Sequence, residues 1–275
     1  MLPQAFLNRM EKMLGEEYAA FLSGYDKPKF QSLRVNTLKG RVEELAFKVD
    51  FLEKPVPWEK NGFYYGEEVR PGKHPYHEAG VYYIQEASAM APVGNLEVHP
   101  GEKVLDLCAA PGGKTFTMAE LMDGKGEIYA FDLHEKRVGL IKKGADRLHL
   151  TNIKAAVGDA SVFNPKLPVF TKILCDVPCS GLGIIGRKPE IKYKNFEDFD
   201  NLPDIQFKIL SNAKNYLKNG GQIMYSTCTL RKAENDEIIS RFLDENKDFS
   251  LSYSHTFMPH KDNTDGFYCA LLNKN

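Results

Sequence analysis

Apolar residues recur at regular spacings along the first third of the chain. Residues 3–23 repeat apolar side chains three and four positions apart, which predicts a helix. Residues 32–68 place strand-like SLRVNT and GFYYG on either side of helix-like VEELAFKV, which predicts a small α/β subdomain. The stretch RPGKHPYHEAG (70–80) is rich in Pro, Gly and His, so we expect a linker or surface loop there. Residues 1–75 are therefore expected to form a first unit.

From about residue 81 the chain alternates between short apolar runs and segments of helical periodicity. The strand-like runs are residues 104–107, 128–132, 153–159, 172–176 and 221–228, followed by the C-terminal FYCALL. The helical segments are residues 85–96, a stretch ending at Met122, and residues 135–149, 203–218 and 233–246. This alternation predicts an α/β fold over residues 76–275, with a mostly parallel sheet covered by helices on both faces.

Five residues with reactive or acidic side chains lie at or just after the ends of predicted strands. In open α/β sheets, ligands bind beyond the carboxyl ends of the strands. A single Asp in such a place is more often a helix cap or turn residue, but three at the ends of strands weaken that explanation. The pattern predicts one shared site containing Cys108, Asp132, Asp159, Asp176 and Cys228.

Composition restricts the class of protein. The net charge of −1 argues against a general polyanion binder, because such binding comes from many Lys and Arg side chains. No run of about 18 apolar residues occurs, and the N-terminus lacks the layout of a signal peptide, so we expect a cytoplasmic protein with no membrane span. The five cysteines include no C-x-x-C pair, so neither a disulfide framework nor a metal site is expected.

The glycine-rich turn VLDLCAAPGGKT (104–115) allows two chemistries. Residues 108–115 nearly match a P-loop, with Cys108 in place of its first Gly, and KILCD would then end in a magnesium-binding Asp. A nucleoside cofactor is the alternative, with Asp132 accepting hydrogen bonds from ribose hydroxyls and Asp159 meeting the base. The fingerprint G-x-G-x-x-G is absent, which favours a methyltransferase over a hydride-transfer enzyme.

The cysteines divide into two kinds by their neighbours. Cys175 and Cys269 lie inside apolar strands and are expected to be buried as small hydrophobic residues. Cys179 and Cys228 have polar, turn-forming neighbours, which predicts accessible thiols over the same sheet edge. These residues alone do not decide which of the two thiols attacks a substrate.

Several motifs together resemble the RNA 5-methylcytosine methyltransferase family of bacterial ribosomal RNA enzymes and their tRNA-modifying relatives. The resemblance covers nearly the whole chain, and the combination of its central three motifs is highly specific. The motifs are SLRVNTLK (32–39), YYIQEASAM (82–90), DLCAAPGGKT (106–115), DVPCSGLG (176–183), YSTCTL (225–230), END (234–236) and DGFYCALL (265–272).

The resemblance implies a Rossmann-like class I methyltransferase preceded by a small RNA-binding subdomain. It implies S-adenosyl-L-methionine as cofactor and methyl transfer to carbon 5 of a cytosine in RNA, ribosomal RNA first and tRNA next. Cys228 is implied as the nucleophile, Cys179 as the thiol that assists release, and Asp176 as the acid near the methyl group and the base. The implied cofactor site comprises Cys108, Ala109, Ala110, Pro111, Gly112, Gly113, Lys114, Asp132, Arg137, Asp159 and Asp176.

Local basic clusters are candidates for the RNA surface of an expected monomer. They are Lys27, Lys29, Arg34, Lys39 and Arg41 in the first unit, and Arg187, Lys188, Lys192 and Lys194 after the Cys179 motif. For any single Lys, a solvated surface position is the simpler explanation. Two other hypotheses stay open: a P-loop nucleotide hydrolase, and a catalytically idle RNA-binding relative.

Overall fold

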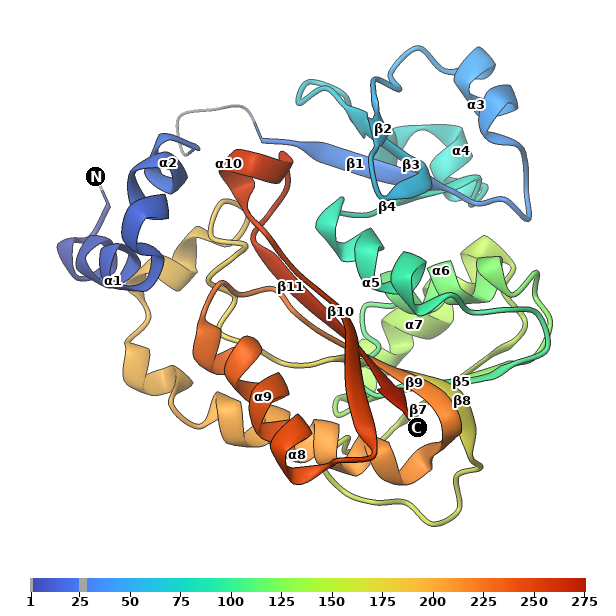
Figure 1. The fold of residues 1–275 in the computed structure, drawn as a ribbon. Helices are drawn as coiled ribbons and strands as arrows, with labels where there is room; N and C mark the ends of the chain where they lie inside the picture. The colour runs from blue at the N-terminus through green and yellow to red at the C-terminus, as the bar shows by residue number, and fades with distance from the viewer. Residues whose placement is uncertain (1, 25–28) are drawn as a thin grey trace.

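The computed structural model describes residues 2–24 and 29–275, with the backbone alone at Phe196, and it contains two β-sheets (Figure 1). The smaller sheet belongs to the N-terminal part of the chain, and the larger sheet to the rest. In the part of the chain described, no helix has both the length and the apolar composition to cross a bilayer.

The smaller sheet has four antiparallel strands in the order β2-β3-β1-β4. Its apolar core joins Leu33 and Val35 to Leu45 and Tyr82. β4 pairs with β1 at one edge of this sheet, and the chain passes from β4 into the part that forms the larger sheet. Its strands and the two helices between them are β1 (Gln31–Val35), α3 (Val42–Lys48), β2 (Pro55–Val56), β3 (Glu59–Tyr65), α4 (Pro75–Glu78) and β4 (Tyr82–Ile84).

The larger sheet has seven strands in the order β10-β11-β9-β8-β5-β6-β7. The five strands from β9 to β7 are parallel, and β11 is antiparallel to both of its neighbours, so β10 runs with the parallel set. The strands are β5 (Lys103–Asp106), β6 (Glu127–Asp132), β7 (Ile153–Val157), β8 (Phe170–Asp176), β9 (Leu217–Thr227), β10 (Phe249–Phe257) and β11 (Phe267–Lys274).

Helices cover both faces of the larger sheet. One apolar core lies under α5 (Ala91–Leu96), α6 (Gly113–Leu121) and α7 (Glu135–Leu148). A second core lies on the opposite face under α8 (Leu202–Ala213) and α9 (Asp236–Glu245). The short helix α10 (Pro259–Asp262) lies between β10 and β11. The predicted α/β class, with a mostly parallel sheet and a small N-terminal subdomain, is confirmed.

Two local predictions were wrong or incomplete. The single helix over residues 3–23 is two helices, α1 (Gln4–Leu14) and α2 (Tyr18–Ser23), because the chain breaks at Gly15 with φ 53°. Strand β10 was not predicted, since most of its side chains are exposed and its sequence lacks a strong apolar alternation. The helices α1 and α2 pack on Leu182, Ile185 and Ile191, in the loop that follows Cys179.

Candidate active site

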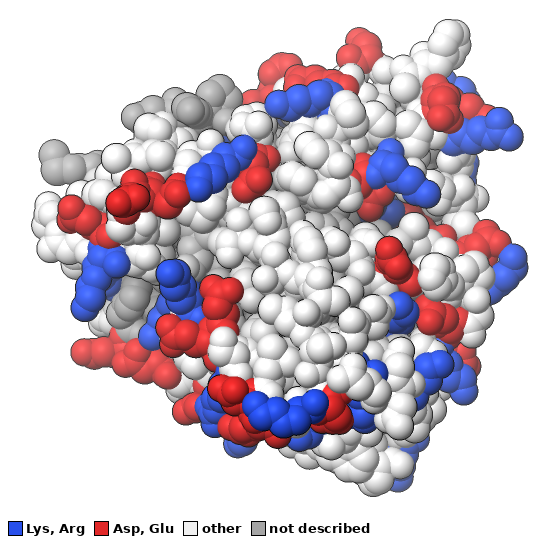
Figure 2. Space-filling view, in the orientation of Figure 1, with Lys and Arg blue, Asp and Glu red and all other residues white. Residues whose placement is uncertain are grey.

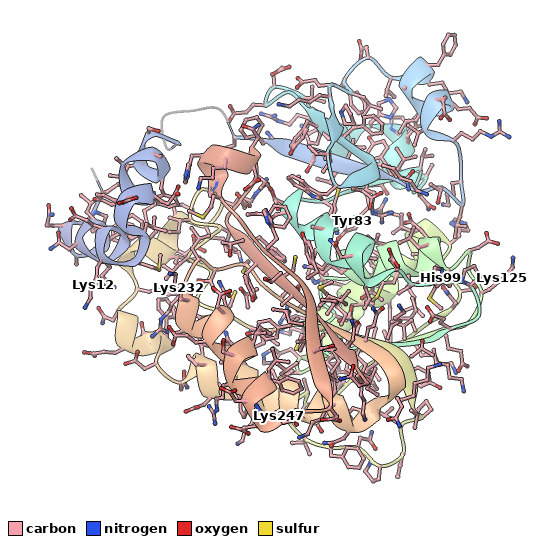
Figure 3. The ribbon with its side chains drawn as sticks, viewed as in Figure 1. Lys12, Tyr83, His99, Lys125, Lys232 and Lys247 are labelled. Atoms are coloured by element: carbon pink, nitrogen blue, oxygen red, sulfur yellow. The ribbon has the colours of Figure 1, made fainter. Side chains whose placement is uncertain are left out.

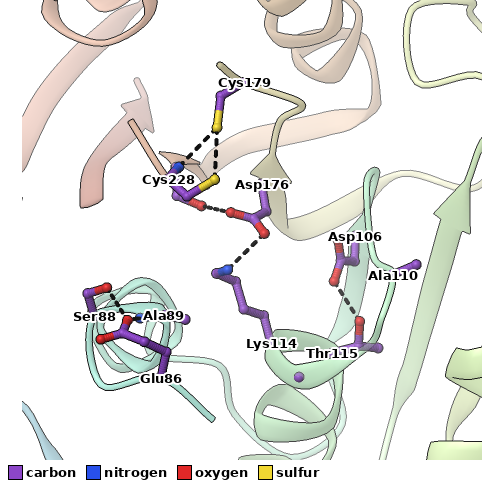
Figure 4. Close-up of polar contacts among 12 residues, drawn as sticks. Glu86, Ser88, Ala89, Asp106, Ala110, Lys114, Thr115, Asp176, Cys179 and Cys228 are labelled. Atoms are coloured by element: carbon purple, nitrogen blue, oxygen red, sulfur yellow. Dashed lines mark hydrogen bonds and ion pairs between the residues drawn. The ribbon is translucent and has the colours of Figure 1, made fainter. Parts of the chain in front are cut away.

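Two thiols from separate loops meet at the carboxyl end of the larger sheet. Cys228 directly follows β9, and Cys179 lies three residues after β8. The sulfurs are 3.0 Å apart, and the backbone N–H of Cys228 donates to Cys179 Sγ at 3.2 Å (Figure 4). Both residues are half-buried free cysteines, whereas Cys175 and Cys269 are buried as expected. Parallel pairing of β8 with β9 places Asp176 opposite Ser226 and so brings the loops together.

Asp176 occupies the centre of a polar chain beside the thiols. Its carboxylate accepts hydrogen bonds from Ser226 Oγ and from Lys114 Nζ, each at 2.7 Å. The side chain of Lys114 is only 11% exposed. Burial disfavours the ammonium form of Lys114, but the Asp176 carboxylate outweighs it and raises the pKa of Lys114 above its ordinary value. The pair therefore joins a nearly buried ammonium to a carboxylate that is 30% exposed, and both residues line the same cavity.

The glycine-rich turn lines a cavity of about 200 Å³ between the two sheets. Gly112 begins α6 with φ 114°, and a Cβ there would meet the Phe116 ring at 2.3 Å, so this turn requires glycine. The backbone can therefore approach a ligand closely at the start of a helix. The cavity is lined by Tyr83, Ile84, Gln85, Glu86, Ala89, Asp106, Cys108, Ala109, Ala110, Pro111, Gly113, Lys114 and Asp176.

Asp106, at the end of β5, is a site residue that the sequence analysis missed. Burial raises the pKa of Asp106 to about 7, despite the hydrogen bond that Thr115 Oγ1 donates to Oδ2. Its Oδ1 is buried and has no hydrogen-bond partner among the described residues. An orphaned carboxylate oxygen in a cavity wall fits a cationic ligand group. The available signal was a charged residue ending the apolar run Val104-Leu105-Asp106-Leu107.

Comparison with known proteins shows which family has these motifs. Residues 93–273 match the family described as 16S rRNA methyltransferase RsmB/F. The chain belongs to the RsmB/F family. Residues 2–87 match the N-terminal domain of 16S rRNA methyltransferase RsmF. The expected cofactor, S-adenosylmethionine, is the methyl donor of this family, and membership rules out the P-loop hypothesis for residues 108–115.

Individual relatives of the RsmB/F family give the extent of the likeness. A probable ribosomal RNA small subunit methyltransferase B of Bacillus subtilis (strain 168) is 37% identical, over 90% of this chain and 60% of its own length. A ribosomal RNA small subunit methyltransferase F of Vibrio cholerae serotype O1 (strain M66-2) is 37% identical, over 86% and 53%. A methyltransferase homolog protein from Pyrococcus horikoshii superposes with a TM-score of 0.86 at 30% identity, covering 100% of both chains. This chain thus spans only part of its curated relatives.

The remaining expected cofactor residues of this RsmB/F chain do not line the cavity. Asp132 ends β6 and is buried, with Arg137 Nη1 at 3.3 Å. Arg137 also donates to the carbonyl oxygen of Ala110 at 2.7 Å, so it connects Asp132 to the glycine-rich turn. Asp159 accepts hydrogen bonds from the backbone and hydroxyl of Ser161, which lower the pKa of Asp159. Its present bonds are those of a turn residue.

The N-terminal subdomain supplies a wall of the site that the sequence analysis did not assign. Glu86 follows β4 and accepts from the backbone N–H groups of Ala89 (3.2 Å) and Asp265 (2.9 Å), and from the hydroxyls of Ser88 and Thr264. Tyr83, labelled in Figure 3, packs edge-on against Phe116 of α6, with the ring centroids 5.3 Å apart. The signal in the sequence was the motif YYIQEASAM (82–90), which contains Glu86 and to which no site role was assigned.

The expected basic clusters are only partly surface features. Arg34 was wrongly placed on an RNA surface: it is 2% exposed and forms an ion pair with Glu120 of α6. Lys39 donates to the carbonyls of Ala79 and Arg147, and Lys27 lies outside the described residues. Figure 2 shows basic and acidic side chains interspersed on one face, without an extended patch of either sign.

The second cluster lies directly after the Cys179 loop. Arg187, Lys188 and Lys194 are exposed there, as is Tyr193. Arg187 is also bound to the Asp265 carboxylate and to the carbonyl of Phe30, at 2.8 Å for the latter. These residues present cationic and aromatic groups on the segment that follows the Cys179 loop.

Proposed function

We propose that this chain transfers a methyl group from S-adenosylmethionine to carbon 5 of a cytosine in RNA. The preferred substrate is 16S ribosomal RNA, because the matching family is described as a 16S rRNA methyltransferase and the curated relatives are named as ribosomal RNA small subunit methyltransferases. The observation that carries the proposal is the 3.0 Å contact between Cys228 and Cys179, with the Asp176–Lys114 pair beside it. One thiol is enough to add to a pyrimidine ring and leave it again, and a second thiol in contact with the first is placed to assist the release.

The residues around the cavity fit the cofactor. The turn from Cys108 to Lys114 would hold its methionine part, with the unpartnered Oδ1 of Asp106 facing the cationic amino group. Asp132, which forms an ion pair with Arg137, would accept hydrogen bonds from the ribose hydroxyls. Asp159 would give up its hydrogen bonds with Ser161 and bind the adenine edge instead. When bound, this cofactor supplies an electrophilic methyl group on a sulfonium.

The chain's own residues prepare the base to receive that group. Carbon 5 of cytosine is a weak nucleophile, and addition of the Cys228 thiolate to carbon 6 makes it enamine-like. Negative charge then develops on the ring, and Asp176 with the Lys114 ammonium forms an acidic hydrogen-bonding pair at the ring nitrogen. The base must leave its stack to reach Cys228, so a loop or an opened helix is the expected substrate.

Cys179 acts after methyl transfer. Its hydrogen bond with Cys228 and its burial raise the pKa of Cys179 well above its ordinary value. A solvent base then removes the carbon 5 proton, the electron pair left behind re-forms the double bond between carbons 5 and 6, and Cys228 leaves carbon 6 as a thiolate. Cys179 is placed to assist that step.

The test is methylation of an in vitro 16S rRNA transcript, followed by bisulfite sequencing. Wild-type protein should yield 5-methylcytosine at a defined position, and Cys228→Ala should yield none while still binding S-adenosylhomocysteine. Cys269→Ala, which removes a buried thiol of β11 that does not line the cofactor cavity, is the matched control and should retain turnover. Full turnover by Cys228→Ala would show that Cys228 is not the nucleophile. A methylated base other than 5-methylcytosine would show that carbon 5 of cytosine is not the target atom.

A further inference from the structure

Two adjacent polar residues are buried just after the Cys228 loop. Glu234 is 0% exposed and Asn235 is 2% exposed, and neither lines the cofactor cavity. Burying a carboxylate and an amide costs free energy unless hydrogen bonds replace those to water. The partners of these two side chains therefore indicate why they are buried.

The Glu234 carboxylate binds the loop that carries Cys179. Its Oε2 accepts from the backbone N–H of Ser180 and from Gln206 Nε2, both at 2.9 Å. Gln206 Nε2 also donates to the carbonyl of Pro178 at 2.9 Å. The peptide groups before and after Cys179 are thus both tied to the Glu234–Gln206 pair.

The Asn235 amide binds the loop that carries Cys228 in the same manner. Its Oδ1 accepts from Thr227 Oγ1 at 2.6 Å, and its Nδ2 donates to the carbonyl of Thr229 at 3.0 Å. Thr227 and Thr229 are the residues on either side of Cys228. One side chain therefore fixes each flank of this cysteine.

The two loops also contact each other near the thiols. Besides the contacts of the sulfurs, Ser180 Oγ and Thr229 Oγ1 are hydrogen-bonded at 2.8 Å, and the backbone N–H of Gly183 donates to the carbonyl of Cys228 at 3.0 Å. Cys179 and Cys228 are 49 residues apart in sequence, but Glu234 and Asn235 are covalent neighbours. Because these two residues share a peptide bond, their side chains hold both cysteine loops at a fixed position relative to each other.

We propose that Glu234 and Asn235 are positioning residues with separate duties: Glu234 holds Cys179 for product release, and Asn235 holds Cys228 for attack. This inference rests on the proposed function, since it assigns the duties through the two thiols. It makes a specific claim, that loss of each neighbour stalls a different step of one reaction. A role in stability alone would slow both steps together.

The experiment measures turnover and the covalent protein–RNA adduct, using a 16S rRNA transcript and S-adenosylmethionine. Glu234→Ala should lower turnover by about 10²-fold and raise the adduct, seen as a denaturant-resistant gel shift, at least tenfold over wild type. Glu234→Gln, whose amide oxygen can still accept from Ser180, should recover much of the turnover. Asn235→Ala should lower turnover by a similar factor without raising the adduct.

Controls separate this claim from misfolding and from failure of the chemistry. Glu237→Gln, exposed on the first turn of α9, should behave as wild type. Each adduct is normalised to the fraction that binds S-adenosylhomocysteine, and Gln206→Met, which frees the Pro178 carbonyl without removing a charge, should reproduce the Glu234→Ala adduct. If the ratio of adduct to product were the same in Glu234→Ala and Asn235→Ala, this inference would be wrong, while the proposed function would stand. Absence of adduct and product from wild type would refute the proposed function, and the inference with it.

Discussion

Removal of the Arg34 guanidinium should destabilise the protein by several kilocalories per mole. Arg34 of β1 reaches Glu120 of α6 with two nitrogens, one of them Nη2 to Oε1 at 3.2 Å, and Arg34 Nε donates to Gln85 Oε1 at 3.2 Å. The side chains are 2% and 1% exposed. Arg34→Met keeps most of the volume but leaves the Glu120 carboxylate buried beside no cation. Breaking a buried pair in this way costs about 3–5 kcal/mol.

The loss should depend on pH in a defined direction. Burial raises the pKa of Glu120, and Arg34 opposes that rise, so the substitution should raise the pKa of Glu120 further. A carboxyl whose pKa is higher in the folded than in the unfolded state favours folding at low pH, and this contribution is lost as the pH rises through the folded pKa. The difference between variant and wild type should therefore be larger at pH 8 than at pH 5.

Urea unfolding at both pH values, followed by far-ultraviolet circular dichroism, measures this difference. Lys247→Met, which removes an exposed ion pair with Asp244, is the matched control and should change the midpoint little. A loss at pH 8 below about 1 kcal/mol, the range of exposed pairs, would refute the reasoning. So would an equal loss at both pH values. If Arg34→Met changed the affinity for RNA but not the free energy of unfolding, Arg34 would be an RNA-binding residue after all.

Three further outcomes are expected. Cys179→Ala should accumulate a denaturant-resistant adduct with RNA, and normal turnover without adduct would make Cys179 structural. Because burial raises the pKa of Asp106 to about 7, affinity for S-adenosylhomocysteine by calorimetry should rise with pH through that value as the carboxylate ionises. Asp106→Asn should remove this dependence, and an unchanged profile would contradict the role of Asp106. Lys114→Met should lower turnover about 10²-fold. Lys125→Met, which removes an exposed ion pair with Asp123, should not lower turnover. Equal turnover of the two variants would show that Asp176 does not require the Lys114 ammonium.

Local pattern explains why the central strands and their terminal residues were predictable. The strands β5, β6 and β8 are bounded by turns and contain contiguous apolar residues, because both of their faces lie under helices. Side chains that follow such strands reach a common edge, which is why Asp176 and Cys228 could be grouped before their positions were known. Strand β10 lacks this signal because it lies at the sheet edge with few buried side chains.

Burial on both faces of a strand explains the error at Arg34. In β1, Leu33 and Val35 alternate with Arg34, and such alternation normally places the charged residue in solvent. Here the second face of β1 is also covered, and every residue from Ser32 to Val35 is buried. The partner that neutralises Arg34 is Glu120, 86 positions away. No local pattern identifies such a partner.

The sequence by itself determined the central strands of the larger sheet and the helices between them, where those strands end, and that two thiols in polar turns follow β8 and β9. Only the tertiary structure decided that those thiols touch, that Asp106 carries an unpartnered oxygen, and that Glu234 and Asn235 tie the two cysteine loops. The physical reason is that contact between distant loops depends on strand register and on helix packing. These sum many weak interactions over the whole chain, whereas local propensity and periodicity report only on neighbouring residues.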